Sequence, residues 1–229
     1  VRAAAREVRR QLLALAASQL GTEASQLSLG DGGIVSAADP ALPLPVSGLE
    51  ALHEQGVVIG VGRRGRNPEG LLSYSWAAHF AEVEVDTRTG SVRVLRLLAA
   101  HDSGRVMNLL SFRSQVFGGI AMGIGFALTE ERVVDRQTGR VLNPSWQDYR
   151  MPTMLEMPEL TCLTIDPGDE LCNTVGAKGL GEPATIPTAA AIANAIHHAT
   201  GVRCRHAPVT PQRLLEALAR SHAGGVSPP

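Results

Sequence analysis

The chain has 229 residues, of which 44% are hydrophobic and 19% charged, and its formal net charge is −1. These values fit a globular protein of one large or two small domains, whereas a nucleic-acid-binding face is normally basic. No apolar run reaches the length of a membrane span, and no signal peptide is visible.

The three cysteines, Cys162, Cys172 and Cys204, lack the spacing of a zinc site, an iron–sulfur cluster or a disulfide framework. Thiols in a reducing compartment are the simpler interpretation. We therefore expect a cytoplasmic protein that binds neither nucleic acid nor membrane, with the periplasm as the alternative location.

The N-terminal quarter predicts short elements joined by turns. Apolar residues recur at helical spacing over residues 3–20, and Gly21 follows where a helix-ending glycine is common. The glycines of residues 30–33 predict a turn before a short apolar piece. A second helix is expected over 47–54 and a strand over 57–62.

The strongest strand signal lies between residues 81 and 99. Apolar and acidic residues alternate over 81–86, the turn 86–90 ends in a glycine, and 92–99 forms the return strand. A second hairpin is predicted at 130–142, and a further strand at 158–165. We expect both tryptophans, Trp76 and Trp146, to be part of the core.

Residues 111–129 predict a helix with four interior glycines. Each costs about 1 kcal/mol relative to alanine in a helix, so something must offset the loss. Close packing against a neighbouring helix is one explanation, and bare backbone on which a ligand can lie is the other. Both stay open on the sequence alone.

The C-terminal third predicts two more helices. One begins at Pro187 and ends before Gly201, and the other has a Thr210 cap followed by proline. The tail 223–229 is expected to be disordered. Together the elements predict an α+β fold with hairpins, mixed sheets and packed helices, possibly as two α+β subdomains.

The segment 176–183, GAKGLGEP, places one carboxylate among three glycines and a proline. Glycine permits positive φ and close approach of a ligand, and Pro183 favours an extended Glu182. The segment therefore predicts a carboxylate presented from a shaped, rigid loop. A solvated glutamate in an ordinary connection is the alternative, since short glycine motifs have many false positives.

Six blocks follow one another over nearly the whole chain: HFAEVEVDTRTGSVRVLR, HDSGRVMN, SQVFGGIAMGIGFALTEE, NPSWQDYRMPT, GAKGLGEPATIPTAAAIANAIHHATG and APVTPQRLLEAL. In this order they resemble the molybdenum-binding subunit of the xanthine dehydrogenase and aldehyde oxidase family, in its C-terminal part. The KGLGE block and the Gln-x-x-Gly-Gly helix are specific in combination.

The resemblance implies a molybdenum hydroxylase that hydroxylates an aldehyde or N-heterocycle with oxygen derived from water. Glu182 matches the family's general base at the Mo–OH group, a role that suits a carboxylate shielded from water, and Gln115 matches a glutamine that hydrogen-bonds the pterin. Gly118, Gly119, Gly179 and Gly181 would let the cofactor approach the backbone, and no residue is implied as a metal ligand. We expect helix 111–129 to pack its glycines against loop 176–183.

The family's molybdenum subunit is much longer, so the chain would hold one wall of a site shared with residues elsewhere. The cofactor would be molybdenum–molybdopterin, in its cytosine dinucleotide form, with iron–sulfur clusters and FAD in partner domains or subunits. The start at Val1 favours a fragment over a natural split subunit, and the chain alone would be inactive. The alternative is a non-catalytic structural or assembly module without cofactor.

Overall fold

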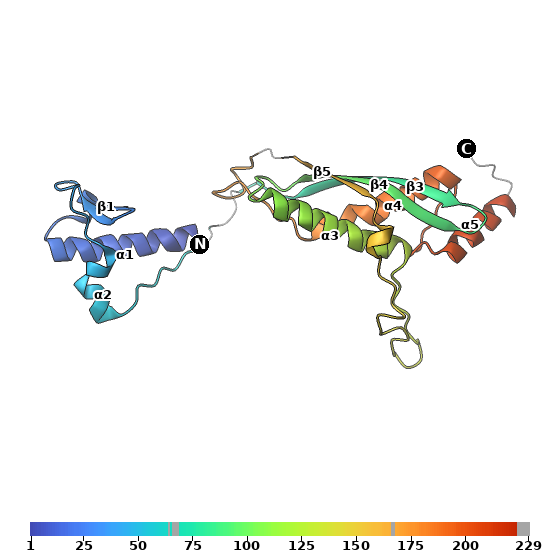
Figure 1. The fold of residues 1–229 in the computed structure, drawn as a ribbon, viewed down its shortest axis with the longest axis horizontal. Coiled ribbons are helices and arrows are strands. Elements are labelled where there is room, and N and C mark those ends of the chain that lie inside the picture. The colour runs from blue at the N-terminus through green and yellow to red at the C-terminus, as the bar shows by residue number, and fades with distance from the viewer. Residues whose placement is uncertain (64, 66–68, 166–167, 224–229) are drawn as a thin grey trace. The chain divides into compact units, whose positions relative to one another are not determined.

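The computed structural model describes residues 1–63, 65, 69–165 and 168–223 (Figure 1). The chain divides into two units, Val1–Asn67 and Pro68–Pro229. The predicted disordered tail lies, from residue 224 on, outside the described residues.

The first unit is built on helix α1 (Arg2–Leu20), which ends at Gly21 in the left-handed conformation with φ of 64°. A two-stranded hairpin, β1 (Leu27–Gly30) and β2 (Gly33–Ser36), and helix α2 (Glu50–Gln55) follow. The predicted first helix, the turn at 30–33 and the short helix are therefore confirmed. A small apolar core, including Leu12, Ile34 and Leu49, joins them.

The predicted strand at 57–62 is wrong. These residues pair with no strand and instead run along α1, where Gln11 Nε2 donates to the Ile59 carbonyl oxygen at 3.0 Å. Gly60 and Gly62 lie so close to the α1 backbone that a Cβ at either would meet Ala4. The residues are apolar, as in a buried strand, but the neighbour is a helix, which offers no ladder of backbone groups.

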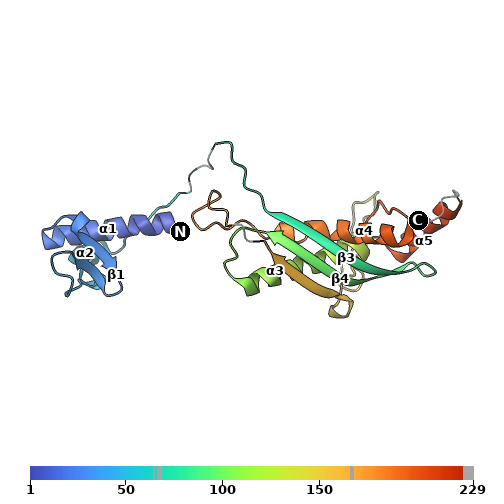
Figure 2. The same cartoon turned by 90° about the horizontal axis from the view of Figure 1, so that it is seen from above.

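The second unit contains a mixed three-stranded sheet of β3 (Trp76–Asp86), β4 (Ser91–Asp102) and β5 (Glu159–Thr164), in that order (Figure 2). β3 and β4 are antiparallel, and β4 and β5 are parallel. The predicted hairpin and the later strand are confirmed. Gly90 has φ of 74° at the end of the hairpin turn, as the turn sequence requires.

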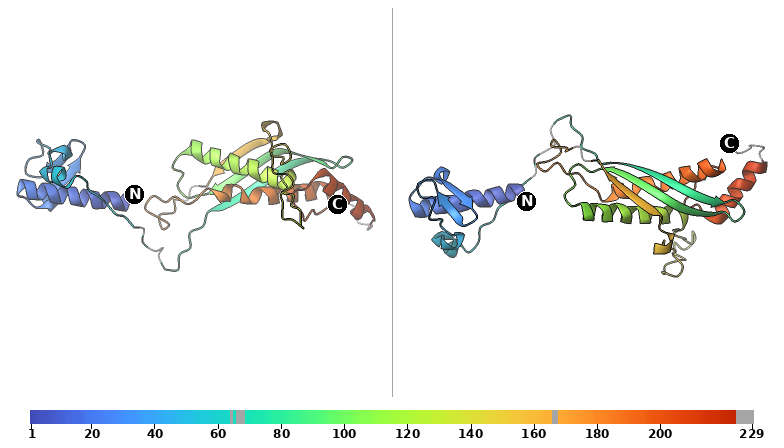
Figure 3. Two further views of the ribbon diagram at one scale, coloured as in Figure 1. Left: turned by 90° about the horizontal axis from the view of Figure 1, so that it is seen from below. Right: turned by 45° about the horizontal axis from the view of Figure 1, so that its top comes forward.

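Helices α3 (Leu109–Leu128) and α4 (Ile186–Thr200) pack against each other and against the sheet, and α5 (Pro211–Ala223) lies by the β3–β4 turn (Figures 1 and 3). The core lies between helices and strands and includes Leu97, Ile120, Ile192 and Leu214. The predicted helices and the α+β class are thus confirmed. Thr210 Oγ1 accepts the Arg213 N–H as the expected cap.

α3 corrects one expectation, since it is long and apolar enough to cross a membrane by length and composition. Its position within the unit explains that composition. Phe112, Val116, Ile120 and Ile124 are buried against the sheet and α4, so the apolar run belongs to the protein core.

The segment after α3 forms an arm that projects from the sheet (Figure 1). The predicted hairpin at 130–142 is reduced to a turn at Gly139 and one bridge between Val134 and Val141. Both tryptophans were wrongly assigned to the core, because Trp76 is 68% exposed and Trp146, on the arm, is 84% exposed.

Candidate functional site

The loop carrying the glutamate is fixed at its first half to the end of β4. Lys178 N–H donates to the Ser103 carbonyl oxygen at 2.7 Å, and Arg105 N–H donates to the Gly176 carbonyl oxygen at 2.7 Å. Gly104 has φ of 61°, and a Cβ there would meet the Gly176 carbonyl oxygen. Glycine is required at this close approach, which extends the sheet by one bridge between Gly104 and Ala177.

The Lys178 ammonium lies 2.9 Å from Asp102 Oδ2 and 3.6 Å from Asp169 Oδ2, with its side chain 8% exposed. Burial opposes the charge on Lys178, but the hydrogen bond and charge of Asp102, with Asp169, outweigh it and raise the pKa of Lys178. Burial likewise opposes ionisation of Asp102, yet the Gly104 N–H and Lys178 lower the pKa of that carboxyl. The loop is therefore anchored by a charged pair within the fold.

The second half of the loop is open. At Gly179 and Gly181, no heavy atom beyond the neighbouring residues lies within 4 Å of the position that a Cβ would take. Glu182 opens a single 3-10 turn (Glu182–Ala184), closed by the Thr185 N–H donating to its carbonyl oxygen at 2.8 Å. The expected extended backbone at Glu182 is thus replaced by a turn, which Pro183 permits because its position needs no N–H donor.

Gln115 lies beside this loop. Its Nε2 donates to the Gly181 carbonyl oxygen at 3.3 Å, across 66 residues of sequence. Helix 111–129 therefore contacts loop 176–183 through Gln115, but the expected packing of the helix glycines on that loop is wrong, because Gly119 and Gly123 face Ala184 and Thr188. Gln115 thus contacts the residue that precedes Glu182, and Gln115 and Glu182 are both exposed.

The glycines of α3 divide into two kinds. Gly118, one helical turn from Gln115, is exposed, and the space where its Cβ would lie is open. Gly119 is buried, and a Cβ there would lie 2.6 Å from the backbone carbon of Ala184; at Gly123 it would meet the Thr188 side chain. Packing against the 3-10 turn and α4 is sufficient reason for Gly119 and Gly123, while Gly118 leaves its backbone bare.

The residues present fit a large planar group laid on this surface. Three glycines, Gly118, Gly179 and Gly181, leave room for close approach, and the Gln115 amide supplies a donor and an acceptor. One expectation is corrected: Glu182 is exposed in this chain and not shielded from water. The surface is therefore one side of a site.

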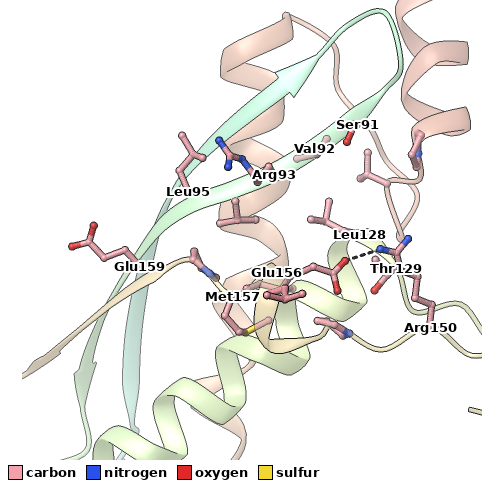
Figure 4. A pocket seen from close by; sticks show the side chains of 17 residues that line it. Ser91, Val92, Arg93, Leu95, Leu128, Thr129, Arg150, Glu156, Met157 and Glu159 are labelled. Atoms are coloured by element: carbon pink, nitrogen blue, oxygen red, sulfur yellow. Dashed lines mark hydrogen bonds and ion pairs between the residues drawn. The ribbon is translucent and has the colours of Figure 1, made fainter.

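A cavity of about 380 Å³ lies elsewhere, between β4, the C-terminal end of α3 and residues 150–159 (Figure 4). Arg150 Nη2 and Glu156 Oε1 pair at 2.6 Å on its rim. Ile124 is the residue of α3 that lines the cavity nearest to Gln115 in sequence. At a helical rise of 1.5 Å per residue, the two residues are roughly 14 Å apart along α3. No predicted site residue is among those that line it within the described chain.

Sequence reasoning missed two polar features of this region. No role was predicted for Lys178, although it is the single lysine beside twenty arginines. The occurrence of one lysine in a chain that otherwise uses arginine was the signal that could have singled out this position. The other is a pair of histidines under α4, whose Nε2 atoms, on His79 and His101, lie 2.9 Å apart; no sequence pattern indicated it.

Residues 1–158 match the family model of the molybdopterin cofactor-binding domain. The chain belongs to this family. It is 36% identical, over 94% of its length, to the putative xanthine dehydrogenase molybdenum-binding subunit XdhA of Escherichia coli K12. It is 34% identical, over 91% of its length, to the aldehyde oxidoreductase molybdenum-binding subunit PaoC of the same organism. The resemblance read from the sequence blocks is confirmed.

Solved structures show the same fold. Quinoline 2-oxidoreductase from Pseudomonas putida 86 matches 93% of the chain with a TM-score of 0.68 and 27% identity. Aldehyde oxidoreductase from Desulfovibrio gigas matches 63% with a TM-score of 0.55 and 34% identity. The chain spans 29% of XdhA, 28% of PaoC and 28% of the quinoline enzyme, so it corresponds to less than a third of these relatives.

Proposed function

We propose that this chain forms one wall of the molybdenum cofactor site of a molybdenum hydroxylase, an oxidoreductase acting on an aldehyde or an N-heterocycle. One observation carries the proposal. Glu182 is exposed and directly follows Gly181, whose carbonyl oxygen accepts the Gln115 amide N–H, and three nearby glycines (Gly118, Gly179 and Gly181) leave their backbone open. The relatives' names supply the reaction class, because they are molybdenum-binding subunits of xanthine and aldehyde oxidoreductases.

In this proposal Glu182 is the general base: its carboxylate accepts the proton of the oxygen nucleophile. The Gln115 amide, held by the Gly181 carbonyl oxygen, orients the pterin through its remaining donor and acceptor. Gly118, Gly179 and Gly181 admit that group to van der Waals distance. When bound, the molybdenum cofactor supplies the two-electron redox chemistry that the side chains of this surface lack.

The role of base requires that Glu182 be removed from bulk water, and in this chain it is exposed. The shielding would come from the bound cofactor and from the polypeptide that the relatives have beyond the matched part. We further propose the cytosine dinucleotide form of the cofactor, electron transfer to iron–sulfur and flavin partner subunits, and a cytoplasmic location.

Replacing Glu182 by glutamine in the full-length molybdenum-loaded enzyme tests the proposal. Glutamine keeps the shape and hydrogen-bonding capacity but cannot accept a proton as a carboxylate does. Loss of a general base typically lowers turnover about two to four orders of magnitude. We expect that loss in dye-linked oxidation of aldehydes and hypoxanthine, with molybdenum content by mass spectrometry unchanged.

Glu170→Gln is the matched control, because Glu170 is an exposed carboxylate on the segment that leads into the same loop. It should retain parental turnover. If Glu182→Gln keeps activity within a few-fold of the parent, Glu182 is not the base. If the full-length protein folds with its partners yet carries no molybdenum, the non-catalytic module is the correct interpretation.

A further inference from the structure

The chain contains twenty arginines and a single lysine, Lys178. That lysine lies four residues before Glu182 in the same loop, and its side chain is 8% exposed. Exposed ion pairs of this unit, such as Arg93 with Glu84, use arginine. The single lysine of the chain is therefore also a buried cation beside the proposed site.

The two carboxylates around Lys178 come from distant parts of the sequence. Asp102 ends β4, and Asp169 lies in the segment that leads into the loop. Their side chains are 18% and 28% exposed, so both are largely withdrawn from water. A compact ammonium with three donors fits between two such groups, whereas the planar guanidinium of arginine is wider and would need more room.

The ion pair reinforces backbone contacts at the same place. Asp102 Oδ1 also accepts the Gly104 N–H at 3.0 Å, which shapes the turn on which the loop lies. The backbone N–H groups of Lys178 and Arg105 donate across that contact, each at 2.7 Å. From Gly179 onward the loop contacts the unit less: Ser75 Oγ donates to the Gly179 carbonyl oxygen and Gln115 Nε2 to that of Gly181.

We propose that Lys178 is a positioning residue for Glu182: buried between Asp102 and Asp169, it clamps the first half of the loop to the end of β4 so that the second half presents the carboxylate beside Gln115. The inference rests on the proposed function for the role of Glu182. The clamp itself is a property of this chain and is measurable without the cofactor. A purely structural lysine would affect the whole unit equally, whereas a clamp acts on the loop.

The first experiment measures amide hydrogen exchange in this chain, comparing the parent with Lys178→Met and Lys178→Arg. We expect the amides of residue 178 and Arg105, and the peptide covering residues 176–185, to exchange at least about tenfold faster in Lys178→Met because the local opening free energy falls. The β3–β4 hairpin should keep its parental rates. Lys178→Arg should recover part of the protection, since it restores the charge with a poorer fit.

Arg213→Met is the matched control. Arg213 pairs with Glu131, 82 residues away, through partly buried side chains, and lies on α5 outside the proposed site. Its loss should lower the stability of the unit without selectively speeding exchange in the loop. If Lys178→Met and Arg213→Met give the same uniform pattern, or if the loop keeps parental exchange in Lys178→Met, the clamp is overturned.

A second variant covers the case in which Lys178→Met fails to fold. Asp169→Asn removes the more distant carboxylate and leaves Lys178 in place. Since the chain has a single ε-amine, acylation by an N-hydroxysuccinimide ester followed by mass spectrometry reports on Lys178 apart from the N-terminus. We expect severalfold faster ε-acylation in Asp169→Asn than in the parent, and an unchanged rate would contradict the clamp.

The last step uses the full-length molybdenum-loaded enzyme. Misplacing a reacting group by about 1 Å can cost roughly a hundredfold in rate, so we expect Lys178→Met to lower kcat at least tenfold with little change in KM, and Lys178→Arg to recover part of it. Loop exchange that rises while kcat stays parental would overturn the positioning role. Retained activity in Glu182→Gln, with the clamp intact by exchange, would overturn only the proposed function.

Discussion

At the scale of single residues, adjacent glycines of α3 have different reasons to be glycine. Gly119 is buried against the backbone of Ala184, and a Cβ there would lie 2.6 Å from it. Gly118 faces open space and is exposed. The sequence alone does not distinguish the two glycines. The residues around each in the folded chain show that Gly119 is needed for close packing and that Gly118 leaves its backbone accessible.

Alanine at these two positions should therefore change stability in opposite directions. Gly119→Ala forces a methyl group into backbone that cannot move aside, and overpacking of this kind costs about 1–3 kcal/mol. Gly118→Ala meets no neighbour and should gain up to about 1 kcal/mol from helix propensity. Urea unfolding of this chain measures both. A stabilised Gly119→Ala would show that α3 and the 3-10 turn are not in close contact.

At the scale of elements, a histidine pair, of which His101 is buried and His79 half-buried, connects two strands and a helix. His79 on β3 contacts Thr188 Oγ1 on α4 through Nδ1 at 2.9 Å, and its Nε2 lies 2.9 Å from His101 Nε2 on β4. The His101 ring meets Phe112 of α3 edge-on. Within the described residues, His101 Nδ1 is buried without a partner, so the pair has little capacity for added charge.

Acid should weaken the second unit through this pair. Burial, together with His101, lowers the pKa of His79 from 6.5 to about 4, and burial lowers the pKa of His101 as well. Between these values the unfolded chain binds more protons than the folded one, so stability rises with pH across that interval. Stability is fully present above about pH 6.5 and is lost as the pH falls toward 4.

Tryptophan fluorescence isolates this effect, because Trp76 and Trp146 both belong to the second unit. Urea midpoints should be lower at pH 5 than at pH 7.5 in the parent, and His79→Gln should reduce that difference. His53→Gln, an exposed histidine of the first unit, is the control and should leave it unchanged. An identical pH dependence in parent and His79→Gln would remove the histidine pair as its cause.

At the scale of the whole molecule, the proposed site is one open surface. Gln115, Gly118, Gly179, Gly181 and Glu182 are all exposed. Small-molecule sites usually bury most of their ligand, and a group lying on this surface would keep much of its area in water. The chain also spans less than a third of the relatives that it matches.

We therefore expect this chain by itself to fold but to bind no molybdenum cofactor tightly and to show no oxidoreductase activity. Its two apolar clusters are sufficient for folding at this size. Molybdenum analysis by mass spectrometry and dye-linked oxidation of aldehyde or hypoxanthine by the purified chain provide the test. Stoichiometric molybdenum with steady turnover from this polypeptide alone would contradict the shared site.

The sequence by itself determined the elements whose causes are local. Alternation over 81–86 with the turn glycine predicted the β3–β4 hairpin, and helical spacing and terminal glycines predicted α1 and α4. The KGLGE block in combination with the Gln-x-x-Gly-Gly helix indicated the family. The hairpin and the helices depend on backbone dihedral preferences or on side-chain periodicity, which a few adjacent residues specify.

Only the tertiary structure decided features that depend on distant neighbours. Residues 57–62 form an apolar run like that of a strand but lie against a helix, and Trp76 is apolar but lies on an uncovered face of the sheet. Lys178 meets its carboxylate partner across 76 residues. Pairing, burial and ion-pair geometry are relations between segments, and a sequence pattern describes one segment at a time.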